Sequence, residues 1–211
     1  MTELYIIRHG QTAANVAGLK QGTIDDERTY LSETGIAQAK ELAGALDLTG
    51  FAALYHSPLH RTVETAQIVN QTAHLPMVAD DRLLEISYGD WDGQLNTDLM
   101  AKYPDLFDPL INDVRAAYAP VANGESFASV EARVQAFTEE VAKAHPDERV
   151  AVVTHGFTVR SFAINATQSH NLTILEPANC SVTKILVDPT SGYQHLVYYN
   201  RSASPAFLAP C

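Results

Sequence analysis

The chain has 211 residues, of which 46% are hydrophobic, and a formal net charge of −11 at pH 7. This length and apolar content suit one well-buried domain, and we expect residues 1–211 to form it. The negative charge argues against a general nucleic-acid binder, which needs a basic face. Since only 14 lysines and arginines are present, a site for an anion must gather its positive side chains locally.

Membrane and disulfide-rich classes are also excluded. No stretch approaches the roughly 20 apolar residues that span a bilayer, and the N-terminus lacks a basic region followed by an apolar core. We therefore expect a cytoplasmic protein that does not enter membranes. Its two cysteines, Cys180 and Cys211, provide neither a disulfide framework nor a cysteine-rich metal site.

Two apolar runs each end in a histidine followed by glycine. Residues 4–8 run into His9, and residues 149–154 run into His155. Short apolar runs between turn signals are typical of core strands in a parallel sheet. If the two strands are neighbours, His9 and His155 converge at their carboxyl ends, where open α/β sheets bind ligands.

Helices and strands alternate along the rest of the chain. Ser32 is expected to cap one helix, and Ser57-Pro58 to begin another after a short strand at 52–55. The later expected elements are a helix between Gly124 and Pro146, the strand that ends at Thr154, a helix at about 157–166, and strands at 181–187 and 193–199. This alternation predicts an α/β fold, a three-layer sandwich with a mostly parallel central sheet and helices on both faces.

Two stretches do not follow this alternation. Residues 88–124 contain scattered aromatics and prolines, and we predict that they form a small inserted lid segment. Residues from about 201 to 211 are expected to form a loose tail.

Positive side chains gather at the predicted edge of the sheet. Arg8 precedes His9, and Arg61 lies in the first turn of the helix that follows the second strand. Two guanidiniums beside imidazoles repel one another unless an anion lies between them. Arginine matches phosphate oxygens in a bidentate manner, and the helix N-termini after residues 57 and 156 add backbone donors. The pattern predicts a phosphate site.

Glu85 is a lone carboxylate among apolar neighbours. At a surface it would be an ordinary glutamate at a strand end, but in a crevice desolvation would raise its pKa and let it act as a general acid. The sequence has no phosphate-binding P-loop, no cysteine-and-arginine phosphatase motif and no set of residues with metal-ligand spacing. We therefore expect a reaction through histidine that uses neither a metal nor a cofactor.

Taken together, these motifs resemble the histidine phosphatase superfamily, in its phosphoglycerate-mutase-like branch of broad-specificity phosphatases. The tripeptide Arg8-His9-Gly10 alone is a loose signal, whereas the ordered set is highly specific and extends from residue 4 to about 187. The set comprises Arg8-His9-Gly10, Asn15, Leu31-Ser32-Glu33-Thr34-Gly35, His56-Ser57-Pro58 with Arg61, Glu85 with Gly89-Asp90-Trp91-Asp92-Gly93, Gly124-Glu125-Ser126 and Thr154-His155-Gly156.

The resemblance implies a role for each of these residues. His9 would attack the phosphoryl group and carry it as a phosphohistidine, and Glu85 would protonate the leaving oxygen and then activate water. Arg8, Arg61 and His155 would bind the phosphoryl oxygens and stabilise the transition state. The further substrate contacts that we expect are Asn15, Gln21, Gly22, Tyr88 and Gly156. The expected partner is a small-molecule phosphate monoester.

Alternative functions remain. A phosphoglycerate mutase would share the same core, but residues 86–124 contain only Lys102 and Arg115 as basic residues, which leaves little to hold a carboxylate. A non-catalytic module that binds a phosphorylated ligand would be expected to lose the nucleophile or the acid, and this chain keeps both. The strand around 196–199 could be an exposed edge that pairs with a second copy, so a homodimer is an open alternative.

The substrate is least defined. The segment 88–124 offers aromatic side chains that either form a local core or pack on an apolar or aryl group. If some line the entrance, hydrophobic phosphate monoesters would be preferred over small acidic ones. These aromatics are Tyr88, Trp91, Tyr103, Phe107 and Tyr118.

Overall fold

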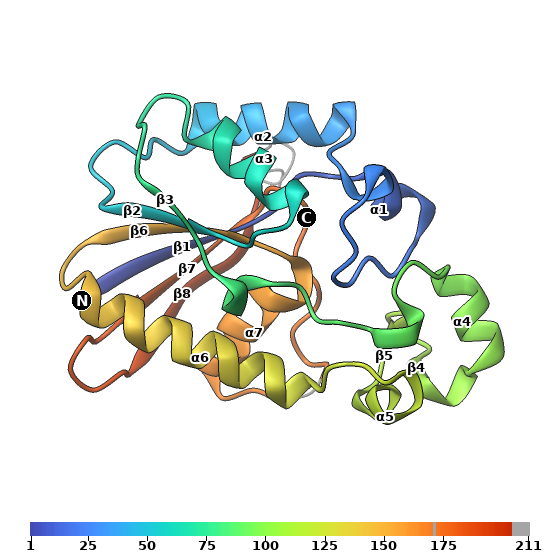
Figure 1. Cartoon of the computed structure of the whole chain (residues 1–211). Helices are drawn as coiled ribbons and strands as arrows, with labels where there is room; N and C mark the ends of the chain where they lie inside the picture. The colour runs from blue at the N-terminus through green and yellow to red at the C-terminus, as the bar shows by residue number, and fades with distance from the viewer. Residues whose placement is uncertain (171, 204–211) are drawn as a thin grey trace, which may run out of the picture.

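The computed structural model describes residues 1–170 and 172–203, and a six-stranded sheet forms its centre (Figure 1). The strands lie in the order β3-β2-β6-β1-β7-β8. Neighbours from β3 to β1 are parallel, whereas β7 and β8 are antiparallel to their neighbours. The bounds are β1 (Thr2–Arg8), β2 (Ala53–His56), β3 (Met77–Ala79), β6 (Arg149–Thr154), β7 (Val182–Val187) and β8 (Gln194–Arg201). The predicted mostly parallel sheet is confirmed.

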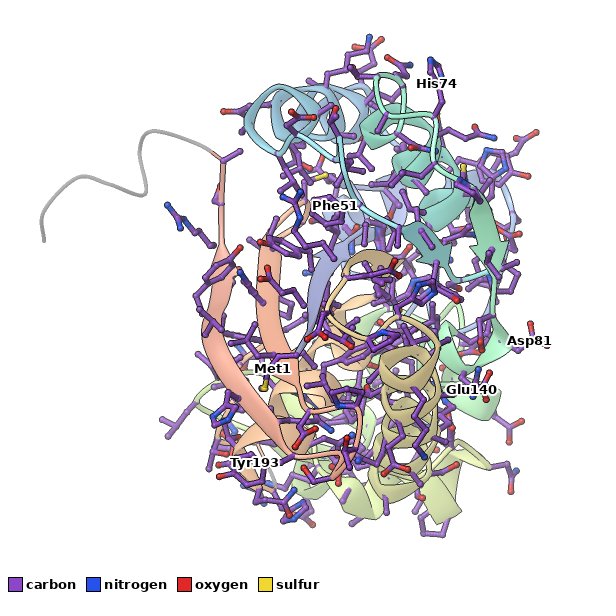
Figure 2. All side chains as sticks on the ribbon, turned by 90° about the vertical axis from the view of Figure 1, so that its left-hand side faces the viewer. Met1, Phe51, His74, Asp81, Glu140 and Tyr193 are labelled. Atoms are coloured by element: carbon purple, nitrogen blue, oxygen red, sulfur yellow. The ribbon has the colours of Figure 1, made fainter. Side chains whose placement is uncertain are left out.

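Helices cover both faces of this sheet, as predicted. Helices α2 (Glu33–Ala45) and α3 (His60–Val69) lie on one face, and α6 (Phe127–Ala144) and α7 (Gly156–Thr167) on the other (Figure 1). Figure 2 shows the same three layers from the side on which β1 begins. The middle residues of the central strands β1 and β6 are largely apolar because both of their faces are covered.

Side chains of the central strands alternate between the two helix layers. Ile7 and Val153 belong to the core cluster under α2 and α3, whereas Ile6 and Val152 belong to the cluster under α6 and α7. All four side chains are 0% exposed. Burying an aliphatic side chain of this size contributes about 1.5–3 kcal/mol, so these two strands hold the scaffold of the site rigidly.

The predicted convergence of the two His-Gly strand ends is confirmed. Strand β1 pairs with β6 in parallel, and Arg8 lies opposite Thr154. The two strands therefore end side by side, and the backbone N–H of His9 donates a hydrogen bond to the Thr154 carbonyl (2.9 Å).

The segment 88–124 folds into short elements beside this end of the sheet (Figure 1). Its Trp91 ring stacks on Tyr103 and Phe107, at centroid distances of 5.0 and 6.0 Å, and packs on Tyr118. Tyr88 packs on Tyr118 at a centroid distance of 5.5 Å, so all five aromatics belong to one local core. The elements are η3 (Gly89–Trp91), α4 (Asn96–Lys102), η4 (Pro104–Leu106), β4 (Phe107–Asp108), β5 (Asp113–Val114), η5 (Ala116–Tyr118) and α5 (Ala119–Ala122).

Three local predictions need correction. Ser57-Pro58 do not begin α3: its N-cap is Leu59, and the Ser57 hydroxyl instead lies 2.8 Å from Nε2 of His155. Between the first strand and the helix that Ser32 caps, where no element was predicted, lies helix α1 (Ala13–Ala17), which a capping box stabilises. Strand β3 was not predicted, because it is only three residues long and largely exposed.

Two short 3-10 helices lie in the loops, η1 (Glu27–Thr29) and η2 (Asp81–Leu83). Strand β8 ends at Arg201, where the tail is predicted to begin, and residues 204–211 of that prediction lie outside the described residues. In the part of the chain that the structure describes, no helix combines the length and the apolar character needed to cross a membrane.

Candidate active site

A pocket of about 810 Å³ opens at the carboxyl ends of the parallel strands. Eight of the ten predicted site residues line it, namely Arg8, His9, Asn15, Gln21, Gly22, Arg61, Glu85 and Tyr88. The other two, His155 and Gly156, lie behind this lining, and His155 is 0% exposed. The structure therefore brings the predicted residues together, but it places His155 in a second layer.

His9 presents one ring nitrogen to the pocket. Its Nδ1 lies 2.7 Å from the carbonyl of Gly10. Because a carbonyl only accepts hydrogen bonds, Nδ1 carries the proton and Nε2 keeps its lone pair in the neutral ring. Burial lowers the pKa of His9 well below its usual 6.5, and the positive charges of Arg61 and Arg8 lower it further. The ring is therefore neutral and has a nucleophilic nitrogen at neutral pH.

His155 uses both of its ring nitrogens within the protein. Its Nδ1 accepts a hydrogen bond from Nε of Arg61 (3.1 Å), so Nε2 carries the proton and faces the Ser57 hydroxyl at 2.8 Å. Burial lowers the pKa of His155 well below 6.5, and the Arg61 charge adds to that effect. Its ring packs edge-on against His9 at a centroid distance of 5.3 Å.

Arg61 is a fixed positive charge. Its guanidinium is 0% exposed and donates to the carbonyls of Gly22 (2.8 Å) and Ile24 (3.0 Å) as well as to His155. Burial lowers the pKa of Arg61 to about 10, which leaves it protonated at neutral pH. These bonds also fix the loop that carries Gly22. A side chain at Gly22 would collide with the carboxylate of Asp92, because a Cβ there would lie 1.7 Å from Oδ1.

Glu85 reaches the pocket from the other side, against the N-terminus of α7. Its carboxylate accepts hydrogen bonds from the backbone N–H groups of Phe157 and Thr158, both at 3.3 Å. Burial raises the pKa of Glu85 above its usual 4.5, and the nearby charge of Glu176 raises it further. Both causes outweigh the hydrogen bonds and the Arg61 charge, so the protonated carboxyl persists to higher pH than in water.

Sequence reasoning missed the surroundings of Arg8. Its Nη2 forms an ion pair with Oε1 of Glu176 (2.6 Å), and its Nη1 donates to the carbonyl of Pro177. Its Nε is buried and has no hydrogen-bond partner among the described residues. Glu176 lies in the loop that connects α7 to β7, and it belongs to none of the sequence motifs.

A second group of charges in the pocket was also missed. Asp113 lies 3.1 Å from Nζ of Lys20 and 3.0 Å from Nη1 of Arg160, and all three residues line the pocket. Burial acts to raise the pKa of Asp113, but the two positive charges outweigh it and lower the pKa. Arg160 offered one signal, since it follows Gly156 by four residues and so lies on the same helix face. Lys20 offered none.

The donor set of the pocket is that of an anion site. Within residues 1–170 and 172–203, no three histidine, cysteine, aspartate or glutamate side chains form a group that could hold a metal ion. The pocket instead combines the guanidiniums of Arg8 and Arg61, the neutral His9 and the Glu85 carboxyl of raised pKa. This combination is typical of proteins that bind phosphoryl groups at the end of a parallel sheet.

Comparison with known proteins gives the family. Residues 4–201 match the model of the histidine phosphatase superfamily (branch 1), and the chain belongs to this superfamily. Phosphoserine phosphatase 1 of Hydrogenobacter thermophilus is 37% identical over 161 residues, which cover 76% of this chain and 74% of that protein. The metal-independent phosphoserine phosphatase of Arabidopsis thaliana is 32% identical over 203 residues, or 93% of this chain and 84% of that protein.

Solved structures agree with the sequence comparison. YhfR of Bacillus stearothermophilus superimposes with a TM-score of 0.84 at 32% identity, covering 95% of this chain and 98% of that one. The predicted family and fold are thereby confirmed. Other relatives that match include an adenosylcobalamin/alpha-ribazole phosphatase of Escherichia coli, at 32% identity, and a probable phosphoglycerate mutase of Yersinia pestis, at 27%.

Proposed function

We propose that the protein is a metal-independent phosphatase that hydrolyses small phosphate monoesters through a phosphohistidine on His9. The observation that carries this proposal is the hydrogen bond from Nδ1 of His9 to the Gly10 carbonyl, which leaves Nε2 free to attack. In the first step Nε2 bonds to phosphorus and the bond from phosphorus to the ester oxygen breaks. In the second step water attacks phosphorus, and the nitrogen–phosphorus bond breaks to regenerate His9.

Glu85 supplies the proton that the leaving oxygen needs. Its raised pKa leaves more of the carboxyl protonated at a given pH than an ordinary glutamate would be, as suits a general acid. After the proton has left, the carboxylate can accept a proton from the attacking water. The N–H groups of Phe157 and Thr158 hold the carboxyl in one orientation for both steps.

The positive groups bind the phosphoryl oxygens and stabilise the charge that spreads over them. Arg61 contributes a fixed guanidinium, and Arg8 contributes the second one. His155 would act from behind, by accepting the hydrogen bond that holds the Arg61 guanidinium in place. The other predicted contacts with substrate are Asn15, Gln21, Gly22, Tyr88 and Gly156.

The pocket walls favour polar substrates. The earlier expectation of hydrophobic monoesters depended on exposed aromatics, but these rings form a local core and only Tyr88 also lines the pocket. Lys20, Asp113, Arg160 and Glu176 line the same pocket. Together with the two named relatives, this lining leads us to propose O-phosphoserine as a substrate. A clear preference for phenyl phosphate over phosphoserine would contradict that choice.

A phosphoglycerate mutase remains the second candidate, because of one observation. Lys20 and Arg160 reach the pocket from outside the segment 88–124, so a carboxylate-bearing substrate has basic side chains within reach after all. Asp113 pairs with both of them and suits the ammonium group that phosphoserine carries and phosphoglycerate lacks. Because the named relatives are also phosphatases, we place phosphatase before mutase.

The test is phosphate release in excess EDTA from phosphoserine, phenyl phosphate, 3-phosphoglycerate and sugar phosphates. Wild type should release phosphate, and His9→Ala should not. His195→Ala is the control, because His195 lies exposed on β8. Isomerisation of phosphoglycerate without release would favour the mutase. Activity that survives in His9→Ala would refute the proposed nucleophile.

A further inference from the structure

Glu176 places a carboxylate inside the pocket that is proposed to bind a phosphoryl group. Its Oε1 lies 2.6 Å from Nη2 of Arg8. The Arg8 side chain is 10% exposed, whereas the Glu176 side chain is 49% exposed. The guanidinium that a phosphoryl oxygen would use is therefore already occupied by an anion of the protein.

The same carboxylate also lies on the N-terminus of α7. A Cβ built on Gly156, the first residue of this twelve-residue helix, would lie 2.3 Å from Oε1 of Glu176. Helix N-termini attract anions through their free N–H groups and the helix dipole. One carboxylate oxygen of Glu176 thus lies beside both an arginine and a helix end that suit a phosphoryl oxygen.

The loop around Glu176 is tied to the site, so this position is built into the fold. The N–H of Cys180 donates to the Arg8 carbonyl (3.1 Å), and the Asn179 amide donates to the His9 carbonyl (3.0 Å). On its outer side, the N–H of Ala178 donates to the side chain of Asn200 on β8 (2.7 Å). The backbone is held on both sides, while the half-exposed carboxylate has room to turn away.

We propose that Glu176 is a positioning residue that competes with phosphate for Arg8 and so sets how tightly the pocket holds anions. This inference rests on the proposed function, because it takes the pocket to be the phosphoryl site. A phosphate that enters must displace the carboxylate or share Arg8 with it. Inorganic phosphate, the product of hydrolysis, meets the same competition, and Glu176 therefore speeds its release.

Binding of inorganic phosphate by calorimetry tests the proposal without any turnover. Glu176→Gln keeps the shape of the side chain and removes its charge, and we expect it to bind phosphate about tenfold more tightly, or about 1.4 kcal/mol. Glu176→Asp, which keeps the charge, should stay nearer to wild type. Glu140→Gln is the matched control. Glu140 also pairs with an arginine, Arg82, but it does not line the pocket and lies near the C-terminal end of α6, which contacts the start of β1 (Figure 2).

The outcomes separate competition from a merely structural role. If Glu176 only held Arg8 in place, Glu176→Gln would bind phosphate equally or less tightly. That result, or no detectable phosphate binding in either protein, would overturn the proposal. In steady state, the inhibition constant of phosphate and the KM for a monoester should fall together in Glu176→Gln. Tighter phosphate binding in a protein without phosphatase activity would refute the proposed function and leave the role of Glu176 intact.

Discussion

Strands β1 and β6 both end in a His-Gly dipeptide at the same edge of the sheet, yet the two histidines differ in which ring nitrogen can react. His9 faces the pocket, and its Nε2 carries a lone pair that no described protein donor satisfies. His155 is fully buried, and its Nδ1 and Nε2 are hydrogen-bonded to Arg61 and Ser57, respectively. The strand brings both rings to the same edge, but their neighbours decide which nitrogen can react.

The chain that follows each dipeptide explains the difference. His155 is the N-cap of α7, which begins at the very next residue and turns the ring inward. After His9, the chain runs close against α2. A Cβ on Gly10 would lie only 2.6 Å from the Gly35 carbonyl, and one on Gly35 only 2.0 Å from the Gln11 carbonyl. These two glycines allow a close approach that leaves His9 at the pocket surface.

Substitution of each histidine by asparagine gives the largest expected effects and tests the comparison directly. His9→Asn should lower kcat by more than about a thousandfold, because it removes the nucleophile. His155→Asn should lower kcat by about a hundredfold, because it leaves the nucleophile in place and removes the ring that holds Arg61. Protein incubated with radiolabelled substrate and quenched in alkaline detergent, in which phosphohistidine is stable, should carry label in His155→Asn and none in His9→Asn. Equal loss of label in both variants would show that the two histidines share one role.

The sequence was sufficient to predict the parts of the site that follow directly from strand ends. His9 and His155 come after apolar runs, and the parallel pairing of those runs places both residues at one edge. Glu85 and Arg61 were predicted through the family motifs as much as through their own surroundings. The position of His155 behind the lining was not predictable, because it depends on a hydrogen bond to Ser57, a residue 98 positions away.

The charged residues around the pocket could not be predicted because none belongs to a local pattern. Lys20, Asp113 and Arg160 come from three separate stretches, and only the folded chain brings Lys20 and Arg160 within 3.1 Å of the Asp113 carboxylate. Counting basic residues between 86 and 124 therefore underestimated the positive charge of the pocket. Short elements such as β3 and α1 were missed for a related reason, since a few residues give too little periodicity to recognise.

Glu85→Gln should have the next largest effect, because the amide cannot give up a proton. We expect kcat for an alkyl phosphate to fall about a hundredfold. The loss should be smaller for phenyl phosphate, whose leaving oxygen needs less protonation. In wild type, kcat/KM should fall as pH rises through the raised pKa of Glu85, and Glu85→Gln should lack this descent. An equal loss for both esters would argue against Glu85 as the general acid.

Thermal unfolding of the same variant gives an independent test of the carboxyl. The pKa of Glu85 in the folded state is raised above its usual 4.5. Stability that depends on this group is therefore fully present below about pH 4.5 and is lost as pH rises through the folded pKa. At neutral pH the ionised carboxylate weakens the fold, and Glu85→Gln should raise the Tm. The gain should vanish at acidic pH, and a gain that is constant with pH would contradict the raised pKa.

Ser57→Ala should have the smallest effect on turnover. It tests whether the hydrogen bond to Ser57 is what distinguishes His155 from His9. Loss of the hydroxyl leaves the buried N–H at Nε2 of His155 without its partner, which should cost about 1–3 kcal/mol of the free energy of unfolding. We expect kcat to fall by only a few fold, because the nucleophile and both arginines remain.

Ser161→Ala is the control for this substitution. Ser161 is equally buried, but its hydroxyl donates to the carbonyl of Phe157 within α7. Its removal therefore leaves no buried side-chain donor without a partner. Urea unfolding of both variants separates the two cases. If Ser57→Ala destabilises the protein no more than Ser161→Ala, Nε2 of His155 does not depend on Ser57. The two histidines would then differ at Nδ1, which donates to the Gly10 carbonyl in His9 and accepts from Arg61 in His155. His155 would be free to donate its proton toward the pocket.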